Sequence, residues 1–318
     1  MSSTTYDALI IGGGPAGLSA ALNLARSLMR VLVVDADRPR NAATMNSHGF
    51  LTRDGIPPHE LRRLGRAELE KYTNVTVLTR QRVHSLERVV APAQVAGAQH
   101  PEFLAHIGKK KATETVRAHR VLLATGLRET LPDVTGLTGF YGMTMFSCAA
   151  CDGWELRQRR LCLIGESADL ADRARLIARF TPDLTVFTHG APVISADDER
   201  ELASRGVTVI RTPIAELRGE RGQLEQAVLT DGTPIELDGG FVRPEWSVNL
   251  SFLDGITPQR DSDGNLAVDS SGRTSEHGLY AAGDVASPGP QQLIVAAGAG
   301  ARAAAIMVHD SVGITTAH

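Results

Sequence analysis

Two cysteines separated by two residues, with a carboxylic acid directly after the second, are the residues of this sequence best suited to chemistry. The motif is Cys148-Ala149-Ala150-Cys151-Asp152. Two thiols at this spacing can form a small disulfide, and because a thiolate attacks a disulfide sulfur, such a pair can exchange electrons with another dithiol or disulfide. The carboxyl of Asp152 could carry the proton that this exchange moves. An alternative role for Asp152 is that of an N-terminal cap for the following segment.

The same cysteine spacing also occurs in structural zinc sites, which need four ligands. The chain has three cysteines in all, and the third, Cys162, lies in the apolar run Leu161–Ile164. That run is typical of a buried strand, so we expect Cys162 to be an inert core residue. The sequence therefore favours a redox centre over a metal site, and no metal is expected.

Length and composition limit the class of protein. A chain of 318 residues suits about two domains, and 42% hydrophobic and 22% charged residues are ordinary for a globular protein. A net charge of -3 gives no electrostatic case for nucleic acid or an anionic membrane. The longest apolar stretches fall short of a bilayer span, and the first residues lack the features of a secretion signal. We expect a cytoplasmic protein whose cysteine pair is cycled by a bound redox group.

A parallel α/β sheet is predicted from the order of the elements. The apolar run Ala8–Ile11 predicts a buried strand, Leu18–Met29 a helix, and Val31–Asp35 the next strand. A second strand-turn-helix unit begins at Leu161, with a helix expected over 168–180 and a strand at Leu184–Phe187. The two similar beginnings indicate a duplicated fold.

The remaining elements are expected as follows. An amphipathic helix should cover Pro58–Tyr72, with short strands over 75–120 that are interrupted by a loop at 91–100. The segment Val121–Gly126 should form a buried strand that ends in a turn, and an Ala-rich helix should run over Gln292–Val308.

The turn after the first strand has the pattern of a dinucleotide-binding loop. Its first glycine permits the tight turn, the second lets backbone approach a pyrophosphate, and the third lets helix and strand pack closely. The helix N-terminus then faces the negative charge, and an acid at the end of the next strand can accept hydrogen bonds from a ribose. The residues expected to contact the dinucleotide here are Gly12, Gly14, Pro15, Ala16, Gly17 and Asp35.

Two further segments identify the dinucleotide. The segment Thr274–Asp284, which ends in Gly283-Asp284, resembles the second FAD signature of the flavin-dependent disulfide reductases. Ala124-Thr125-Gly126 is similar to the short strand-to-turn motif of the same family. The resemblance implies that FAD is bound and that Asp284 contacts its ribityl and pyrophosphate region. By itself, Asp284 could also be an ordinary turn aspartate.

The chain as a whole resembles the low-molecular-weight thioredoxin reductases, which carry Cys-x-x-Cys-Asp-Gly in mid-chain. The segment Gly283–Leu293 keeps their spacing, with Gln291 in place of arginine and Leu293 in place of alanine. The resemblance implies two Rossmann-like, three-layer ββα dinucleotide-binding domains and a homodimer. The FAD domain would comprise residues 1–122 and 253–318, and a central domain, 123–252, would carry the cysteines. The helix that starts near Gln292 would point its positive end at the flavin.

The central domain departs from that family where NADPH would bind. The reductases have a glycine-rich turn there, and arginines that hold the 2′-phosphate about twenty residues later. Here residues 165–168 read Gly-Glu-Ser-Ala, and residues 188–190 read Thr-His-Gly. Glu166 would place a carboxylate near an incoming pyrophosphate, and no arginine is present to form a fork on a phosphate. Weakened or absent NADP(H) binding is therefore expected.

Other segments resemble the thioredoxin-reductase-like dithiol oxidases of disulfide natural products, of the gliotoxin, holomycin and romidepsin type. These segments are Arg40–Phe50, Pro58–Tyr72 and Gly-Trp-Glu-Leu at 153–156. The Cys-Ala-Ala-Cys-Asp core itself is closer to the reductases. His48 and Phe50 could line the approach of a substrate, although a histidine beside glycine is often structural. Trp154 is expected to be a packing residue.

The resulting hypothesis is an FAD-dependent oxidase that closes a disulfide in a small-molecule dithiol. By resemblance, the substrate thiolate attacks Cys148, Cys151 faces the flavin, and dioxygen reoxidises the flavin to give hydrogen peroxide. Three alternatives stay open. The chain could be an NAD(P)H-dependent thioredoxin or disulfide reductase, a ferredoxin-fed relative, or a flavin-bound redox sensor without turnover.

Overall fold

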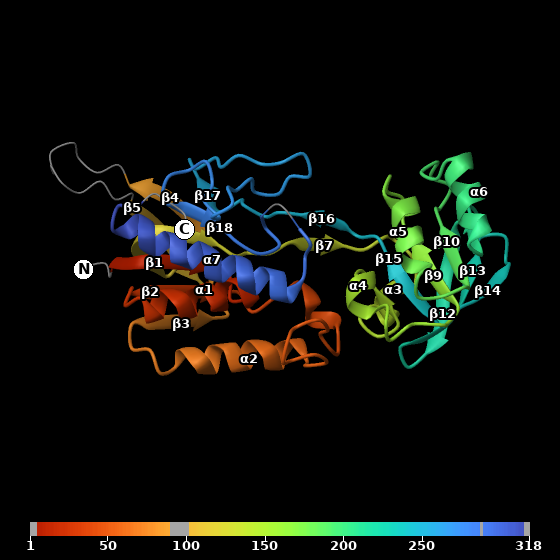
Figure 1. The fold of residues 1–318 in the computed structure, drawn as a ribbon, viewed down its shortest axis with the longest axis horizontal. Helices are drawn as coiled ribbons and strands as arrows, with labels where there is room; N and C mark the ends of the chain where they lie inside the picture. Colours follow the sequence, from red (N-terminus) through yellow and green to blue (C-terminus); the bar gives the residue numbers. More distant parts are fainter. Residues whose placement is uncertain (1–4, 90–101, 287–288, 315–318) are drawn as a thin grey trace. The chain divides into compact units, whose positions relative to one another are not determined.

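A computed structural model describes residues 5–89, 102–286 and 289–314. The chain divides into two compact units (Figure 1). Unit 1 contains residues 1–42, 49–128 and 247–318, and unit 2 contains 43–48 and 129–246. We had expected the boundaries at 122/123 and 252/253. The difference arises because Ala124 and Leu250 are buried in the cores of unit 1, so the segments around them stay with that unit.

A parallel sheet with the strand order β18-β6-β1-β2-β3 forms the centre of unit 1. The bounds are β18 Leu279–Ala281, β6 Glu114–Leu123, β1 Thr5–Ile11, β2 Val31–Asp35 and β3 Val75–Thr79. Antiparallel strands continue this sheet from β6, and β17 pairs with the last of them. These are β5 Glu102–Gly108 and β4 Arg82–Val89, followed by β17 Leu253–Asp254. Ala8–Ile11 of β1 and Val31–Val34 of β2 are apolar and buried, as expected for strands covered on both sides.

Helices α1 (Pro15–Arg26) and α7 (Leu293–Ser311) pack side by side on this sheet (Figure 1), and α2 (Pro58–Leu69) packs against α1. The α1–α7 contact depends on a missing side chain. A Cβ on Gly300 would lie 2.0 Å from the carbonyl oxygen of Ala16, so only glycine permits this approach. The short 3-10 helix η1 covers Arg40–Ala43.

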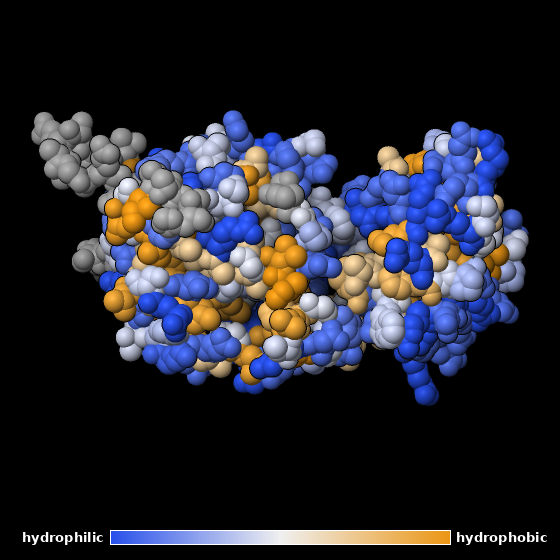
Figure 2. Space-filling model, in the orientation of Figure 1, coloured by the Kyte–Doolittle hydropathy of each residue, from blue (hydrophilic) through white to orange (hydrophobic). Residues whose placement is uncertain are grey.

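Helix α7 corrects one expectation from the sequence. We had judged all apolar stretches too short for a bilayer, but α7 is long and apolar enough to span one by length and composition. Its buried residues include Ala303, Ala304 and Met307, which belong to the core that α7 shares with α1. Figure 2 shows hydrophobic side chains along this helix, where Ile294 and Val295 are more than a third exposed. One face of α7 therefore packs in the core of unit 1, and 33% of its apolar stretch is buried.

Unit 2 has a second parallel sheet, with the strand order β11-β10-β9-β15-β8. The bounds are β11 Val207–Ile210, β10 Leu184–Phe187, β9 Leu161–Ile164, β15 Gly239–Val242 and β8 Met145–Phe146. A separate antiparallel sheet contains β12 Ile214–Glu220, β13 Gln223–Leu229 and β14 Pro234–Glu236. The helices are α3 Leu137–Phe140, α4 Ala149–Asp152, α5 Leu170–Ile177 and α6 Ala196–Ser204. Each unit thus combines a parallel sheet with antiparallel strands and covering helices, which confirms the predicted fold class.

The chain enters unit 2 through β7 (Arg128–Thr130) and leaves it through β16 (Glu245–Ser247), and these two strands pair with each other. Strands β2 and β10 have the predicted bounds, whereas α1 begins and ends three residues earlier than predicted and α5 is shorter at both ends. The loop predicted at 91–100 lies outside the described residues.

Candidate active site

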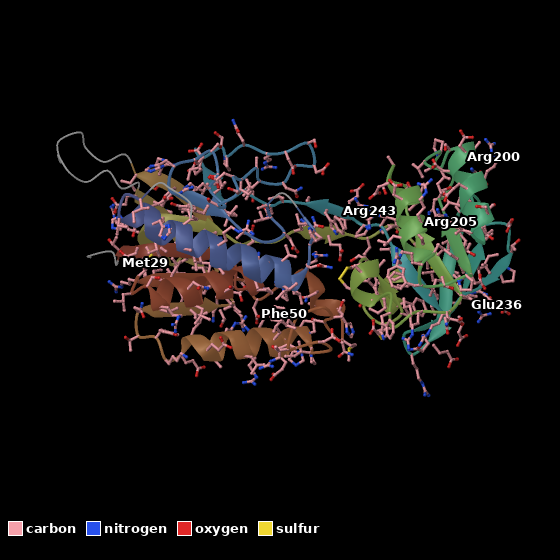
Figure 3. All side chains as sticks on the ribbon, in the orientation of Figure 1. Met29, Phe50, Arg200, Arg205, Glu236 and Arg243 are labelled. Atoms are coloured by element: carbon pink, nitrogen blue, oxygen red, sulfur yellow. A yellow bond between two sulfur atoms is a disulfide. The ribbon has the colours of Figure 1, made fainter. Side chains whose placement is uncertain are left out.

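The two cysteines of the motif form a disulfide at the start of α4, visible as the yellow bond in Figure 3. Their Cα atoms are 5.2 Å apart. Cys148 is the N-cap of the helix, and its carbonyl oxygen accepts hydrogen bonds from the backbone N–H groups of Cys151 and Asp152, both at 3.1 Å. Both cysteines are half-buried. The disulfide is therefore held on a short hydrogen-bonded turn with part of its surface open to reaction.

Asp152 is the last residue of α4 and is 8% exposed. The segment after it, 153–159, is turn rather than helix, so the alternative role as a helix cap is not supported. Burial raises the pKa of Asp152 to about 7, while His48 lowers it and Glu155 raises it further. A carboxyl with a pKa near neutrality can both accept and return a proton, which suits thiol chemistry.

His48 and Glu155 flank this carboxyl within unit 2. The Nδ1 atom of His48 lies 3.8 Å from Oε1 of Glu155. The structure thus brings His48 to the redox motif, whereas Phe50 belongs to unit 1, where its carbonyl oxygen accepts a turn hydrogen bond from Arg53. The expectation for Trp154 was wrong, because its side chain is 67% exposed and is covered only in part by Arg157, whose guanidinium lies 4.1 Å from the ring centre.

The glycine-rich loop in unit 1 has the geometry of a pyrophosphate cradle. Gly12 has a φ of +113°, and a Cβ there would lie 2.2 Å from the carbonyl oxygen of Ala124. A Cβ on Gly17 would lie 1.9 Å from the carbonyl oxygen of Gly12. At Gly14, the N-cap of α1, no atom lies within 4 Å of a Cβ position. Two glycines therefore close the loop, and the third leaves open space at the helix N-terminus, with Pro15 and Ala16 beginning the helix.

These roles predict different behaviour for two alanine variants. Gly14→Ala should leave the thermal stability of the apoprotein unchanged and weaken FAD retention about tenfold or more, because the new methyl group meets only the cofactor. Gly17→Ala should lower both the thermal stability of the apoprotein and the retention of FAD, because its methyl group collides with the loop itself. Thermal melting of apoprotein and FAD titration measure the two effects. Equal losses of stability in both variants would contradict the assignment.

Asp35, at the end of β2, is 7% exposed and is surrounded by donors. Its carboxylate accepts hydrogen bonds from Arg66 at 2.7 Å and from the Asp37 backbone N–H at 3.0 Å. Hydrogen bonding by Arg66, joined by Arg62, holds the pKa of Asp37 below its ordinary value against the opposing effect of burial. Within the described residues, the Nε atoms of Arg62 and Arg66 are buried without a partner. Such donors suit the adenosine diphosphate half of FAD.

The carboxyl end of β18 supplies the second part of the cofactor site. Gly283 has a φ of +79°, and the Asp284 carboxylate that follows accepts a hydrogen bond from Arg40 at 2.9 Å. Thr125 Oγ1 is buried without a partner among the described residues. The segment continues to Gln291 and to Gln292, which is the N-cap of α7. Unsatisfied buried donors, an open cradle and a helix N-terminus together fit FAD.

Sequence reasoning missed Arg40, Arg62 and Arg66. The only signal for the last two was their spacing of four residues on the predicted helix 58–72, which places them on one face. Gly126 and Leu293 lie beside the other predicted cofactor residues in the turn after β6 and at the start of α7.

The corresponding cleft of unit 2 lies at the carboxyl ends of β9 and β15, where the strand order reverses. Here the protein's own charged side chains line it. A Cβ on Gly165 would lie 2.7 Å from Cβ of Arg243, the residue that follows β15 and is labelled in Figure 3. Arg243 Nε donates to the carboxylate of Asp169, the N-cap of α5, at 3.0 Å, and Arg173 Nε donates to it at 2.7 Å.

The charges in this cleft are unsuited to a pyridine nucleotide. Burial alone would raise the pKa of Asp169, but hydrogen bonds from Ser167, Arg173 and Arg243 outweigh it and lower the pKa to about 2. A permanent carboxylate thus occupies the N-terminus of α5. His189, 3.7 Å from Glu166, follows β10 where a phosphate-binding arginine would be needed, and burial lowers its pKa although Glu166 opposes this. The residues present do not fit NADPH.

Comparison with known proteins agrees with the fold and the cofactor site. The family model of pyridine nucleotide-disulphide oxidoreductases matches residues 6–300. The putative thioredoxin reductase TrxB from Bacillus anthracis is 35% identical, with a TM-score of 0.84 over 98% of this chain and 100% of that one. The structure of HlmI is 33% identical, with a TM-score of 0.88 over 96% of this chain and 92% of that one.

A probable thioredoxin reductase from Arthroderma benhamiae is 34% identical over 185 residues, which are 58% of this chain and 44% of that protein. Thioredoxin reductase aclD from Aspergillus oryzae is 28% identical over 87% of this chain and 83% of its own length. The chain therefore belongs to the pyridine nucleotide-disulphide oxidoreductase family, as a thioredoxin reductase-like oxidoreductase with FAD as its cofactor.

Proposed function

We propose that this protein is an FAD-dependent oxidase that forms an intramolecular disulfide in a small-molecule dithiol. One observation carries the proposal: Asp169, Arg173 and Arg243 form an ion-pair cluster in the cleft of unit 2 in which a reductase would bind its electron donor. The cysteine motif and the FAD site are nevertheless intact. A redox disulfide without an NADPH site is suited to receiving electrons from a dithiol rather than delivering them to a disulfide.

In the proposed reaction, a substrate thiolate attacks the sulfur of Cys148, and the Cys148–Cys151 bond breaks. The second substrate thiol then attacks the mixed disulfide and expels the Cys148 thiolate, so that the substrate leaves as a cyclic disulfide. The two substrate protons pass to the cysteine sulfurs, with the Asp152 carboxylate as acceptor and donor in between. FAD held by the unit 1 loop would supply the acceptor for the electron pair of the reduced cysteines, and dioxygen would take that pair with two protons to give hydrogen peroxide.

The side chains around the disulfide give each step a candidate group. Asp152, with a pKa of about 7, exists in both protonation states near neutral pH. His48, beside Glu155, can orient or neutralise an incoming thiolate. The exposed indole of Trp154 offers an apolar surface three residues after Cys151. We further propose a homodimer in the cytoplasm, where substrate dithiols stay reduced.

Anaerobic reduction of the flavin tests the direction of electron flow. After anaerobic mixing, dithiothreitol should rapidly bleach the flavin absorbance of the purified holoenzyme. Hydrogen peroxide should form when air is then admitted. NADPH at the same concentration should leave the flavin oxidised, because Arg173 and Arg243 of the unit 2 cleft are already paired with the Asp169 carboxylate and no arginine follows β10 at residues 188–190. Rapid bleaching by NADPH would instead support the alternative, an NAD(P)H-dependent disulfide reductase.

A further inference from the structure

Glu129, on β7, connects three segments of unit 2 through its two carboxylate oxygens. Oε1 accepts a hydrogen bond from Nε1 of Trp246 at 3.1 Å, and Oε2 accepts one from the hydroxyl of Tyr141 at 2.5 Å. The Tyr141 hydroxyl also lies 3.0 Å from Oγ of Ser147, the residue directly before Cys148. One carboxylate therefore joins the entering strand β7, the leaving strand β16 and the segment that carries the disulfide.

Glu129 and Trp246 lie on the same, covered face of the β7–β16 strand pair. Glu129 and Trp246 are half-buried, whereas the residues on either side of each of them are exposed. Because side chains alternate along a strand, this pattern sets Glu129 and Trp246 on the covered face of the β7–β16 pair. The phenol and the indole both donate to a charged carboxylate, and partial burial strengthens such charge-assisted hydrogen bonds.

Trp246 is fixed from its other side by the charged cluster in the unit 2 cleft. The guanidinium carbons of Arg243 and Arg173 lie 4.5 and 5.6 Å from the centre of its ring. Both arginines bind the Asp169 carboxylate, so neither can swing away without breaking an ion pair. Cation–π contacts on the indole face and a hydrogen bond at its edge hold Trp246 in one orientation.

Tyr141 is held in place by contacts with the strand that leads to the disulfide. It forms an isolated bridge with Met145 of β8, and the Gly142 backbone N–H donates to the Met145 carbonyl at 2.8 Å. Strand β8 leads through Ser147 into Cys148. A shift of the Tyr141 ring would therefore move the residues from which the disulfide turn begins.

We propose that Glu129 is a positioning residue for thiol–disulfide exchange at Cys148. Through Tyr141 and Ser147, Glu129 fixes the start of the disulfide turn. On the opposite side of Trp246, Arg173 and Arg243 of the unit 2 cleft hold the indole in place. Exchange requires an attacking sulfur in line with the breaking bond, so a small displacement of the turn slows it. The inference rests on the proposed function only in that a dithiol reacts at Cys148.

Variants of the holoenzyme test this role in the isolated half-reaction. Glu129→Gln keeps the shape of the side chain and removes its charge, and Tyr141→Phe removes only the hydroxyl. In anaerobic stopped flow at saturating dithiothreitol, each should lower the rate constant of flavin reduction about tenfold. FAD content and the dithiol concentration at half-saturation should stay at wild-type values. The equilibrium of the disulfide with a glutathione redox buffer should shift as well.

Thr181→Val is the matched control, because its hydroxyl donates to the backbone carbonyl of Arg159 at 2.5 Å elsewhere in unit 2. This variant should lose thermal stability without losing rate. The double variant Glu129→Gln/Tyr141→Phe should be no slower than the slower single variant, since both act on one path. A wild-type rate in Tyr141→Phe, a multiplicative loss in the double variant, or losses that follow melting temperature alone would overturn the proposal. Because reduction by dithiothreitol needs neither NADPH nor dioxygen, failure of the oxidase assignment would leave this test intact.

Discussion

Cys148→Ser and Cys151→Ser variants are expected to bind FAD and to lose dithiol oxidation by a factor on the order of 10³ or more. Serine cannot form the disulfide that accepts the electron pair, so neither variant can pass electrons from substrate to flavin. The fold should tolerate both changes. The disulfide spans a sequence separation of only 3 residues, and closing so short a loop contributes little to stability.

Peroxide formation with dithiothreitol in air, at equal FAD content, measures this loss. Cys162→Ala is the control, because Cys162 is 0% exposed and its sulfur lies 3.7 Å from that of Met145, in the core of unit 2. That variant should turn over at the wild-type rate with some loss of stability. Turnover that persists in both Cys148→Ser and Cys151→Ser would refute the mechanism.

The second large effect concerns Asp152. The rate of anaerobic flavin reduction by dithiol should rise with pH through about 7, because only the carboxylate can accept the substrate proton. Asp152→Asn should lower this rate about a hundredfold and remove this step from the pH profile. A retained step with unchanged midpoint would show that another group is the base.

Two neighbouring variants should move that midpoint in opposite directions. Glu155 raises the pKa of Asp152 and His48 lowers it. Glu155→Gln should therefore shift the midpoint to lower pH, and His48→Gln should shift it to higher pH. Shifts in the same direction would contradict the electrostatic assignment.

The same carboxyl has an opposite effect on stability. Because its pKa is raised in the folded protein, folding is favoured by the protonated form, and this contribution is present below the unfolded pKa near 4 and is lost as pH rises through about 7. The difference is on the order of a few kcal/mol. Asp152→Asn cannot ionise, so its free energy of unfolding relative to wild type should increase between pH 5 and pH 8.

Local signals made the cofactor loop and the redox motif predictable. Gly12, Gly14 and Gly17 lie within one turn, and Cys148 and Cys151 lie within another, so spacing alone defines their geometry. The ends of helices were less predictable. Helix α1 starts at Pro15 directly within the glycine turn, and its C-terminal end is followed by Leu28 in a left-handed conformation, with a φ of +62°.

Residues that act through distant contacts were not predictable. Arg40 meets Asp284 across 244 residues, and Glu129 meets Trp246 across 117. No local pattern marks either pair, because each contact exists only after the sheets have formed. The exposure of Trp154 was missed for a similar reason, since an aromatic residue beside a glycine gives no sign of which way it faces.

The division of unit 1 between two distant stretches of chain has a consequence for biogenesis. Unit 2 consists mainly of the continuous stretch 129–246, so a growing chain can complete it as soon as that stretch has left the ribosome. The parallel sheet of unit 1 gains β18 and the covering helix α7 only from residues made afterwards. Flavin capture is therefore a late event in synthesis, and nascent chains that stall before residue 279 should carry a folded redox unit without the pigment.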